Sequence, residues 1–149
     1  MKLRILAIAA SVAVLAAWTS PRAGNYSAHM NASNATPPTA ENGTGLAAIR
    51  VDGNKLTYTV TVSDLSGPAT AAHIHVGADG VSGPPIVTFE IKNGGKGRIA
   101  EGSIDLSKNA GNGVSGDSLR VLLGNGSAYV NVHTAKHPGG EIRAQIVQE

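Results

Sequence analysis

Apolar and polar residues alternate along most of the chain from Gly45 onward, a pattern typical of half-buried β-strands. The clearest run is KLTYTVTVSDL at residues 55–65, where leucine, tyrosine and valine at the even positions alternate with threonines. One face of this strand is therefore expected in the core and the other in water. The preceding Asp52-Gly53 is a favourable hairpin turn. Six further strand-like runs are GLAAIRV, AAHIHV, PIVTFEI, GRIAEGSI, SAYVNVHT and EIRAQIVQ, at residues 45–51, 71–76, 85–91, 97–104, 127–134 and 141–148.

One segment departs from the strand pattern. SGDSLRVLLGN at residues 115–125 predicts a short helical turn that is capped by Ser115 or Asp117 and closed by Gly124. The chain has 19 glycines, and most of them separate the strand-like runs. We therefore predict an all-β fold, an antiparallel, Greek-key-like β-sandwich of seven or eight short strands.

The first 23 residues have the features of an export signal. Lys2 and Arg4 precede Ile5–Trp18, an apolar run that only Ser11 interrupts. This run is shorter than the roughly 20 apolar residues that span a bilayer, so we expect a cleaved signal peptide rather than a permanent anchor. An uncleaved N-terminal anchor is the alternative.

The remaining chain divides into two parts by composition. Residues 24–43 are rich in Asn, Ser, Ala, Pro and Gly and predict a flexible lead-in, whereas residues 44–149 predict the β-sandwich domain. Together with the signal peptide at residues 1–23, this organisation predicts an exported protein, periplasmic or extracellular. We expect no contact with a membrane beyond the signal segment.

Charge and cysteine content exclude several classes of function. The chain has 12 Lys and Arg against 10 Asp and Glu, and removal of residues 1–23 takes away three basic residues, which leaves nine against ten. A mature chain of this charge lacks the basic excess expected of a nucleic-acid-binding protein. The absence of cysteine excludes disulfides and thiolate metal sites, including a blue-copper site.

Four of the five histidines lie in two short stretches, and these are the candidate functional residues. His73 and His75 are two apart on a predicted strand, so their side chains point to the same side, about 6.6 Å apart. In VNVHTAKHPGGEIR, His133 lies on the polar face of its strand and His137 precedes a tight Pro-Gly-Gly turn. Together they predict an imidazole-only metal site for copper, with zinc as the alternative. Hydrogen bonds from strand histidines to the backbone are the competing interpretation. His29 is expected to be a solvated loop residue.

The histidine stretches and their surroundings resemble a known family. AAHIHVGADGVSGPPIV, GNGSAYVNVHTAKHPGGEIRAQI and LTYTVTVSDLSGPATAAHIH are similar to the CHRD domain, a module first described in chordin and widespread in exported bacterial proteins. The resemblance covers roughly residues 26–148. It implies an extracellular module, and chordin's binding of growth factors implies a protein-interaction role as one possibility.

The histidines also show a weaker resemblance to the copper ligands of Cu/Zn superoxide dismutases. In that comparison His73 and His75 match a strand pair of ligands, and His133 matches a later one. No histidine occurs at residues 76–132, so the zinc-bridging part of the pattern is missing. This departure weakens an enzymatic interpretation.

Three functions follow from these observations. The favoured one is an exported CHRD-type domain that binds copper through His73, His75, His133 and His137, for metal holding, delivery or sensing. The alternatives are a superoxide dismutase-like copper enzyme and an extracellular protein-interaction module without metal. Near the last histidines, Glu141 and Arg143 are expected either to orient a ligand histidine or to form a surface ion pair.

Overall fold

The computed structural model describes residues 23–149; the predicted signal peptide lies almost wholly outside the described residues. The described chain contains eleven strands, one 3₁₀ helix and one α-helix. They are β1 (Ala23–Asn31), η1 (Ala32–Asn34), β2 (Thr44–Asp52), β3 (Lys55–Ser63), β4 (Ala69–Val76), β5 (Pro85–Phe89), β6 (Gly97–Asp105), β7 (Asn109–Gly111), β8 (Val114–Ser115), α1 (Gly116–Gly124), β9 (Ala128–Thr134), β10 (Ile142–Gln145) and β11 (Val147–Gln148). The predicted all-β class is confirmed.

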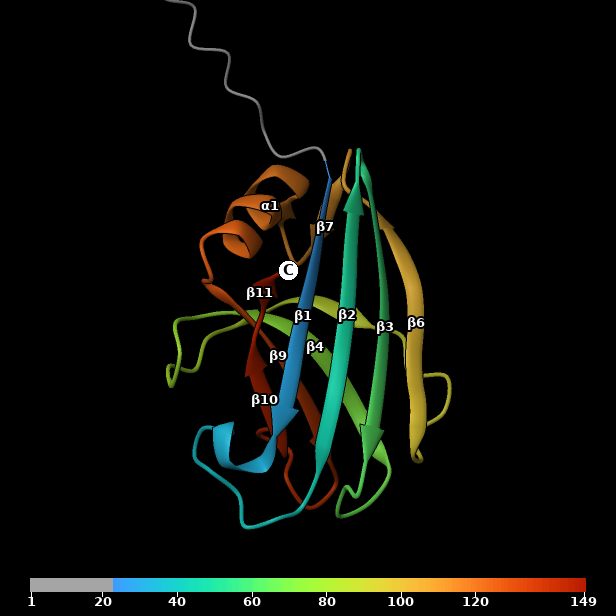
Figure 1. Cartoon of the computed structure of the whole chain (residues 1–149), viewed down its shortest axis with the longest axis vertical. Helices are drawn as coiled ribbons and strands as arrows, with labels where there is room; N and C mark the ends of the chain where they lie inside the picture. Colours follow the sequence, from blue (N-terminus) through green and yellow to red (C-terminus); the bar gives the residue numbers. More distant parts are fainter. Residues whose placement is uncertain (1–22) are drawn as a thin grey trace, which may run out of the picture.

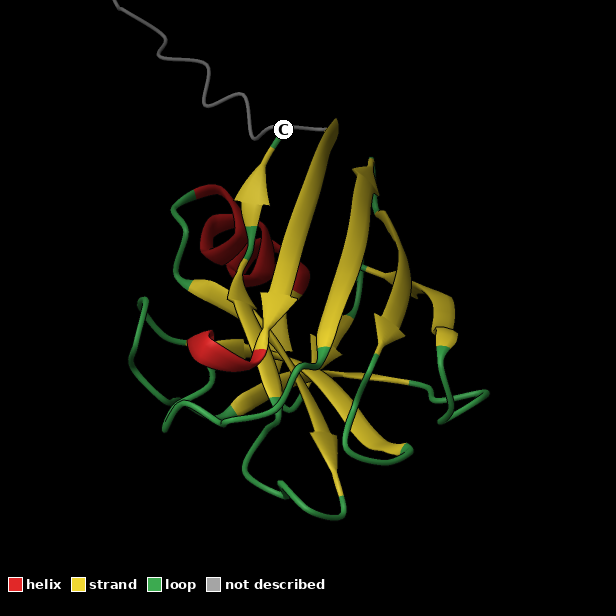
Figure 2. Ribbon diagram, turned by 60° about the horizontal axis from the view of Figure 1, so that its bottom comes forward, coloured by secondary structure: helices red, strands yellow, loops and turns green. Residues whose placement is uncertain are grey.

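Nine of the strands form one antiparallel sheet that curls until it nearly closes (Figures 1 and 2). Its order is β5-β4-β9-β10-β1-β2-β3-β6, with β11 paired to β1. An isolated bridge from Ile91, just after β5, to Ala100 on β6 joins the two ends. The strand count exceeds the predicted seven or eight because β1, β7 and β8 were not predicted and the last predicted run divides into β10 and β11. β4 and β9 pair near one end of this order, and they carry the candidate histidines.

The alternating strands bury their apolar face as predicted. On β3, Leu56, Val60 and Val62 are at most 2% exposed, whereas the intervening threonines are half-buried or exposed. The apolar faces of the curled sheet meet in a single core. Burial of these side chains is the main stabilising contribution to such a fold.

The predicted flexible lead-in differs from the structure over its first part. Residues 24–31 belong to β1, in which every residue pairs with β2, and the strand also pairs with β10 and β11. Tyr26, Ala28 and Met30 are buried on one face. Their alternation with Asn25 and His29 is weak in the sequence because alanine is small, and burial of the strand depends on its neighbours on both sides.

The predicted helical turn is confirmed as α1. Ser115 is its N-cap, and the Ser115 side chain accepts a hydrogen bond from the backbone N–H of Ser118. Leu119 and Leu123 anchor the helix to the core. Within residues 23–149, no helix has the length and apolar character needed to cross a bilayer.

The position of β1 inside the sheet gives a prediction for two adjacent residues. Met30→Ala should lower the free energy of unfolding by about 2–5 kcal/mol, because it removes a side chain that is 2% exposed. His29→Ala, at the exposed neighbouring position, should change it by less than about 0.5 kcal/mol. Urea denaturation of the two variants measures both values; equal, negligible effects would show that the segment is a loose lead-in.

Candidate metal centre

The pairing of β4 with β9 places the candidate histidines on one face of the sheet. The two strands are antiparallel, with Ala71 opposite His133, His73 opposite Asn131 and His75 opposite Tyr129. Residues directly opposite each other in a sheet, and residues two apart on one strand, share a face. The three histidines therefore lie on the face that points away from the core.

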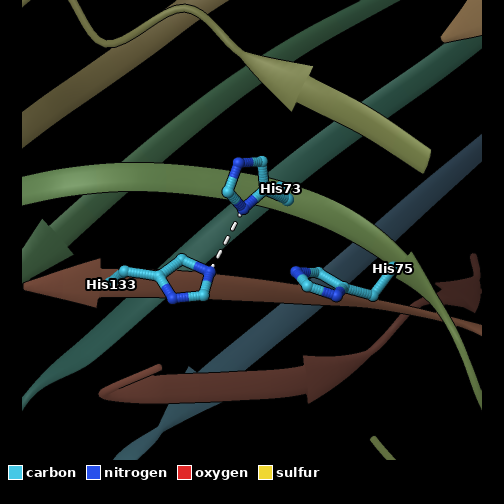
Figure 3. Close-up of side chains that lie close together, drawn as sticks. All are labelled: His73, His75 and His133. Atoms are coloured by element: carbon cyan, nitrogen blue, oxygen red, sulfur yellow. Dashed lines mark hydrogen bonds between the residues drawn. The ribbon is translucent and has the colours of Figure 1, made fainter. Parts of the chain in front are cut away.

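His73, His75 and His133 come together there, as predicted (Figure 3). One ring nitrogen from each lies within 4.8 Å of the others, and Nδ1 of His73 is 3.1 Å from Nε2 of His133. Two ligands of one metal ion are at most about 4.2 Å apart when each bond is about 2.1 Å long. Because 4.8 Å is the upper limit of the separations between these nitrogens, the rings would need to close by less than about 1 Å around an ion. This group of residues could hold a metal ion.

Two of the rings are oriented by backbone carbonyl groups. Nδ1 of His75 is 2.8 Å from the carbonyl oxygen of Gly83, and Nδ1 of His133 is 2.9 Å from that of Pro138. A carbonyl oxygen only accepts, so each Nδ1 carries the proton of a neutral ring and each Nε2 keeps a lone pair. Nε2 of His75 is buried and has no hydrogen-bond partner. A buried acceptor without a partner costs about 1–3 kcal/mol, and a metal ion would supply the missing contact.

Both carbonyl groups depend on glycines in the adjacent loops. A Cβ on Gly83 would collide with the carbonyl oxygen of Val76, so only glycine allows this loop to approach the end of β4. Gly140 has a φ of +122°, which favours glycine, and closes the turn that contains Pro138. The sequence indicated turns at these places but not the bonds that they make to the histidines.

Burial keeps the three imidazoles neutral. The pKa of His73 falls from 6.5 to about 4, first because the ring is withdrawn from water and then because His133 and His75 would repel its charge. Burial also lowers the pKa of His75. The hydrogen bond to Gly83 opposes this effect, and His133 and Arg143 lower the pKa further. The pKa of His133 is lowered by burial as well. Neutral rings at pH 7 have the lone pairs that a metal requires.

The structure separates His137 and His29 from this group. Nε2 of His137 is 3.0 Å from a carboxylate oxygen of Glu41, which Lys136 also contacts at 2.6 Å. The predicted fourth ligand therefore lies apart from the three, because the turn after β9 directs it toward the loop before β2. His29 is exposed, as expected, although it belongs to β1 rather than to a loop.

Glu141 and Arg143 do not form the surface ion pair that the sequence left open. Both are buried, at 0% and 2% exposed. The Arg143 guanidinium lies 3.6 Å from the centroid of the Tyr129 ring, and this ring stacks on His75 with centroids 4.9 Å apart. Tyr129 was missed in the sequence, although it lies four residues before His133 and so shares its face. Arg143 is therefore linked to the candidate ligand His75 through Tyr129.

The comparisons with known proteins identify the family. The family model described as the CHRD domain matches residues 26–146, most of the chain. The protein therefore belongs to the CHRD domain family. Searches of curated proteins and of solved structures found no match.

The lowered pKa values predict how the metal-free protein responds to acid. Below about pH 6.5 the unfolded chain protonates these histidines, whereas folded His73, facing His75 and His133, stays neutral until about pH 4. The unfolded state therefore binds more protons, and the free energy of unfolding should fall as the pH drops through this window. Denaturation in EDTA between pH 7.5 and 4 measures the slope.

Two variants isolate the contribution of His73 to the pH dependence of the free energy of unfolding. His73→Gln should reduce the slope, because the glutamine cannot be protonated in either state. His29→Gln, at an exposed site, should leave the slope as in the wild type. An unchanged slope for His73→Gln would contradict the prediction.

Proposed function

We propose that this chain is an exported CHRD domain that binds one copper ion through His73, His75 and His133, and that it holds, delivers or senses the metal. One observation carries the proposal: Nε2 of His75 is buried without a partner beside the facing nitrogens of His73 and His133. Strand histidines that served only the backbone would have their nitrogens satisfied or in water. Because Nε2 of His133 is the acceptor, Nδ1 of His73 donates the hydrogen bond that joins these two rings. A metal ion would replace this shared proton once His73 carries its proton on Nε2 instead, and the three facing nitrogens would then all have lone pairs.

The chemistry of the ligand set supports copper. Imidazole nitrogen is a poor ligand for magnesium and calcium and a good one for copper and zinc, and copper(II) binds nitrogen sites more tightly than zinc does. Three histidines fill three positions, so a bound ion keeps room for a further ligand from solvent. Zinc, which prefers four tetrahedral ligands, is the second choice.

The predicted signal peptide and the family support export. CHRD domains are typically extracellular, and the N-terminal pattern of Lys2, Arg4 and the apolar run is that of a secretory signal. Outside the cell, a site without cysteine avoids oxidation of its own ligands. Metal holding, delivery or sensing requires only binding and release, which the three histidines can provide.

Replacement of single histidines tests the proposal. We expect the wild type to bind one Cu(II) per chain near pH 7, and His73→Ala, His75→Ala and His133→Ala each to weaken binding by at least about 100-fold. Loss of a residue that only hydrogen-bonds a metal ligand typically weakens metal affinity 10–100-fold. Loss of a ligand itself should therefore weaken the affinity at least as much. Titration with Cu(II), followed by electron paramagnetic resonance, measures the affinity and the number of nitrogen ligands.

Two other histidines serve as matched controls. His137→Ala should change the affinity only slightly, since Glu41 already engages that ring, and His29→Ala should leave it unchanged. If His29→Ala weakens binding as much as His73→Ala does, copper binds at β1 and the proposal is wrong.

A further inference from the structure

A buried arginine without a counter-ion lies beside the candidate metal centre. The Arg143 guanidinium donates hydrogen bonds to three neutral oxygens, which are Thr36 Oγ1 at 2.8 Å and the carbonyl oxygens of Ala78 at 2.9 Å and Val81 at 3.0 Å. None of the ion pairs within residues 23–149 includes Arg143. These hydrogen bonds engage the guanidinium but do not neutralise its charge, which is an unfavourable state for a buried side chain.

Glu141, the buried carboxylate two residues before Arg143, does not neutralise this arginine. Glu141 accepts hydrogen bonds from the backbone N–H of Ser66 at 2.7 Å, from the Ser66 hydroxyl, and from the Thr134 hydroxyl at 2.6 Å. These donors occupy its oxygens at the end of β9. The positive charge of Arg143 therefore acts without a paired anion.

Tyr129 connects this charge to a candidate metal ligand. β9 lies between β10 and β4, and the Tyr129 ring contacts Arg143 from one neighbouring strand and His75 from the other. The two contact distances, 3.6 Å and 4.9 Å, together set an upper limit of about 8.5 Å between the guanidinium carbon and the centre of the His75 ring. Tyr129 is 2% exposed, so its ring and not water occupies the space between Arg143 and His75. The electric field of the guanidinium charge is therefore weakly screened at His75.

We propose that the charge of Arg143 makes the three-histidine site selective for monovalent over divalent copper. This inference rests on the proposed function, because it takes copper at His73, His75 and His133 as given. A metal ion bound to His75 is repelled by Arg143, and Coulomb's law makes the repulsion twice as large for Cu(II) as for Cu(I). The neutral imidazoles add no charge that would cancel the difference.

The size of the effect is measurable. An ion on Nε2 of His75 would lie about 3 Å from the centre of that ring, and so at most about 12 Å from the guanidinium carbon. At an effective dielectric constant of about 20, one extra charge at that distance changes the relative affinity by on the order of tenfold. The selectivity ratio, Kd for Cu(II) divided by Kd for Cu(I), should therefore depend on the charge near Arg143. For a one-electron couple a tenfold change in this ratio corresponds to about 59 mV in reduction potential.

A substitution beside Arg143 tests the charge while it keeps the arginine in place. Thr36→Asp puts a carboxylate next to the guanidinium at a half-buried position, and Thr36→Asn is the matched neutral control. We expect Thr36→Asp to lower the selectivity ratio about three- to tenfold and Thr36→Asn to keep it within about twofold of the wild type. The full chain is titrated anaerobically with Cu(I) against bicinchoninate and, separately, with Cu(II) against nitrilotriacetate.

Arg143→Gln provides an independent variant and separates charge from positioning. Removal of the charge should lower the ratio on the order of tenfold. If Arg143 only held the loop of Ala78 and Val81, its loss would weaken both forms of copper equally and leave the ratio unchanged. That result, or equal ratios for Thr36→Asp and Thr36→Asn, would overturn the inference. Should Arg143→Gln fail to fold, the Thr36 pair decides alone.

The outcome also distinguishes this inference from the proposed function. If the wild type binds neither Cu(I) nor Cu(II), both the proposed copper site and the proposed selectivity are wrong. A wild type that binds copper with a ratio insensitive to the Thr36 and Arg143 variants keeps the proposed function and rejects only the selectivity.

Discussion

The antiparallel pairing of β4 with β9 is the interaction on which both the core and the candidate metal centre depend. On the inner face it buries Ile74, Val130 and Val132, all 0% exposed, and on the outer face it aligns the three imidazoles. Because side chains alternate with a period of two, a slip of one residue between the strands would exchange the faces. The apolar inner face therefore fixes the register, and the register brings His133 to the pair His73 and His75.

The outer face of these strands is covered by loops that hydrogen bonds hold in place. Arg143 binds the carbonyl groups of Ala78 and Val81, Gln145 binds that of Gly77 at 2.6 Å, and the Tyr129 hydroxyl accepts from the N–H of Gly83 at 3.0 Å. This loop shields the imidazoles from water and thereby lowers their pKa values. It also provides the carbonyl group that orients His75, so the same contacts shape the site and keep it neutral.

The candidate centre contains several groups whose local environment is unfavourable. A nitrogen of His75 has no partner, three imidazoles are withdrawn from water, and Arg143 is buried without an anion. Elsewhere the sequence follows the ordinary rules of alternation, turns and capping, as in β3 and α1. Groups that break these rules together in one place, while the rest of the fold supplies the stability, are typical of a functional site.

The sequence by itself determined the all-β class, the short helix and the likeness to the CHRD family, because alternation, capping and motifs are local. It also placed His73 and His75 on one face, since strand geometry fixes residues two apart, and it singled out His133. Only the tertiary structure decided that β1 lies inside the sheet, because Ala28 and its small or polar neighbours carry too weak a pattern to show burial. Only the tertiary structure also decided that His137 contacts Glu41. The same holds for Tyr129, which packs between Arg143 and His75. Those contacts depend on loop paths and strand order, which join residues far apart in the chain and leave no local periodicity.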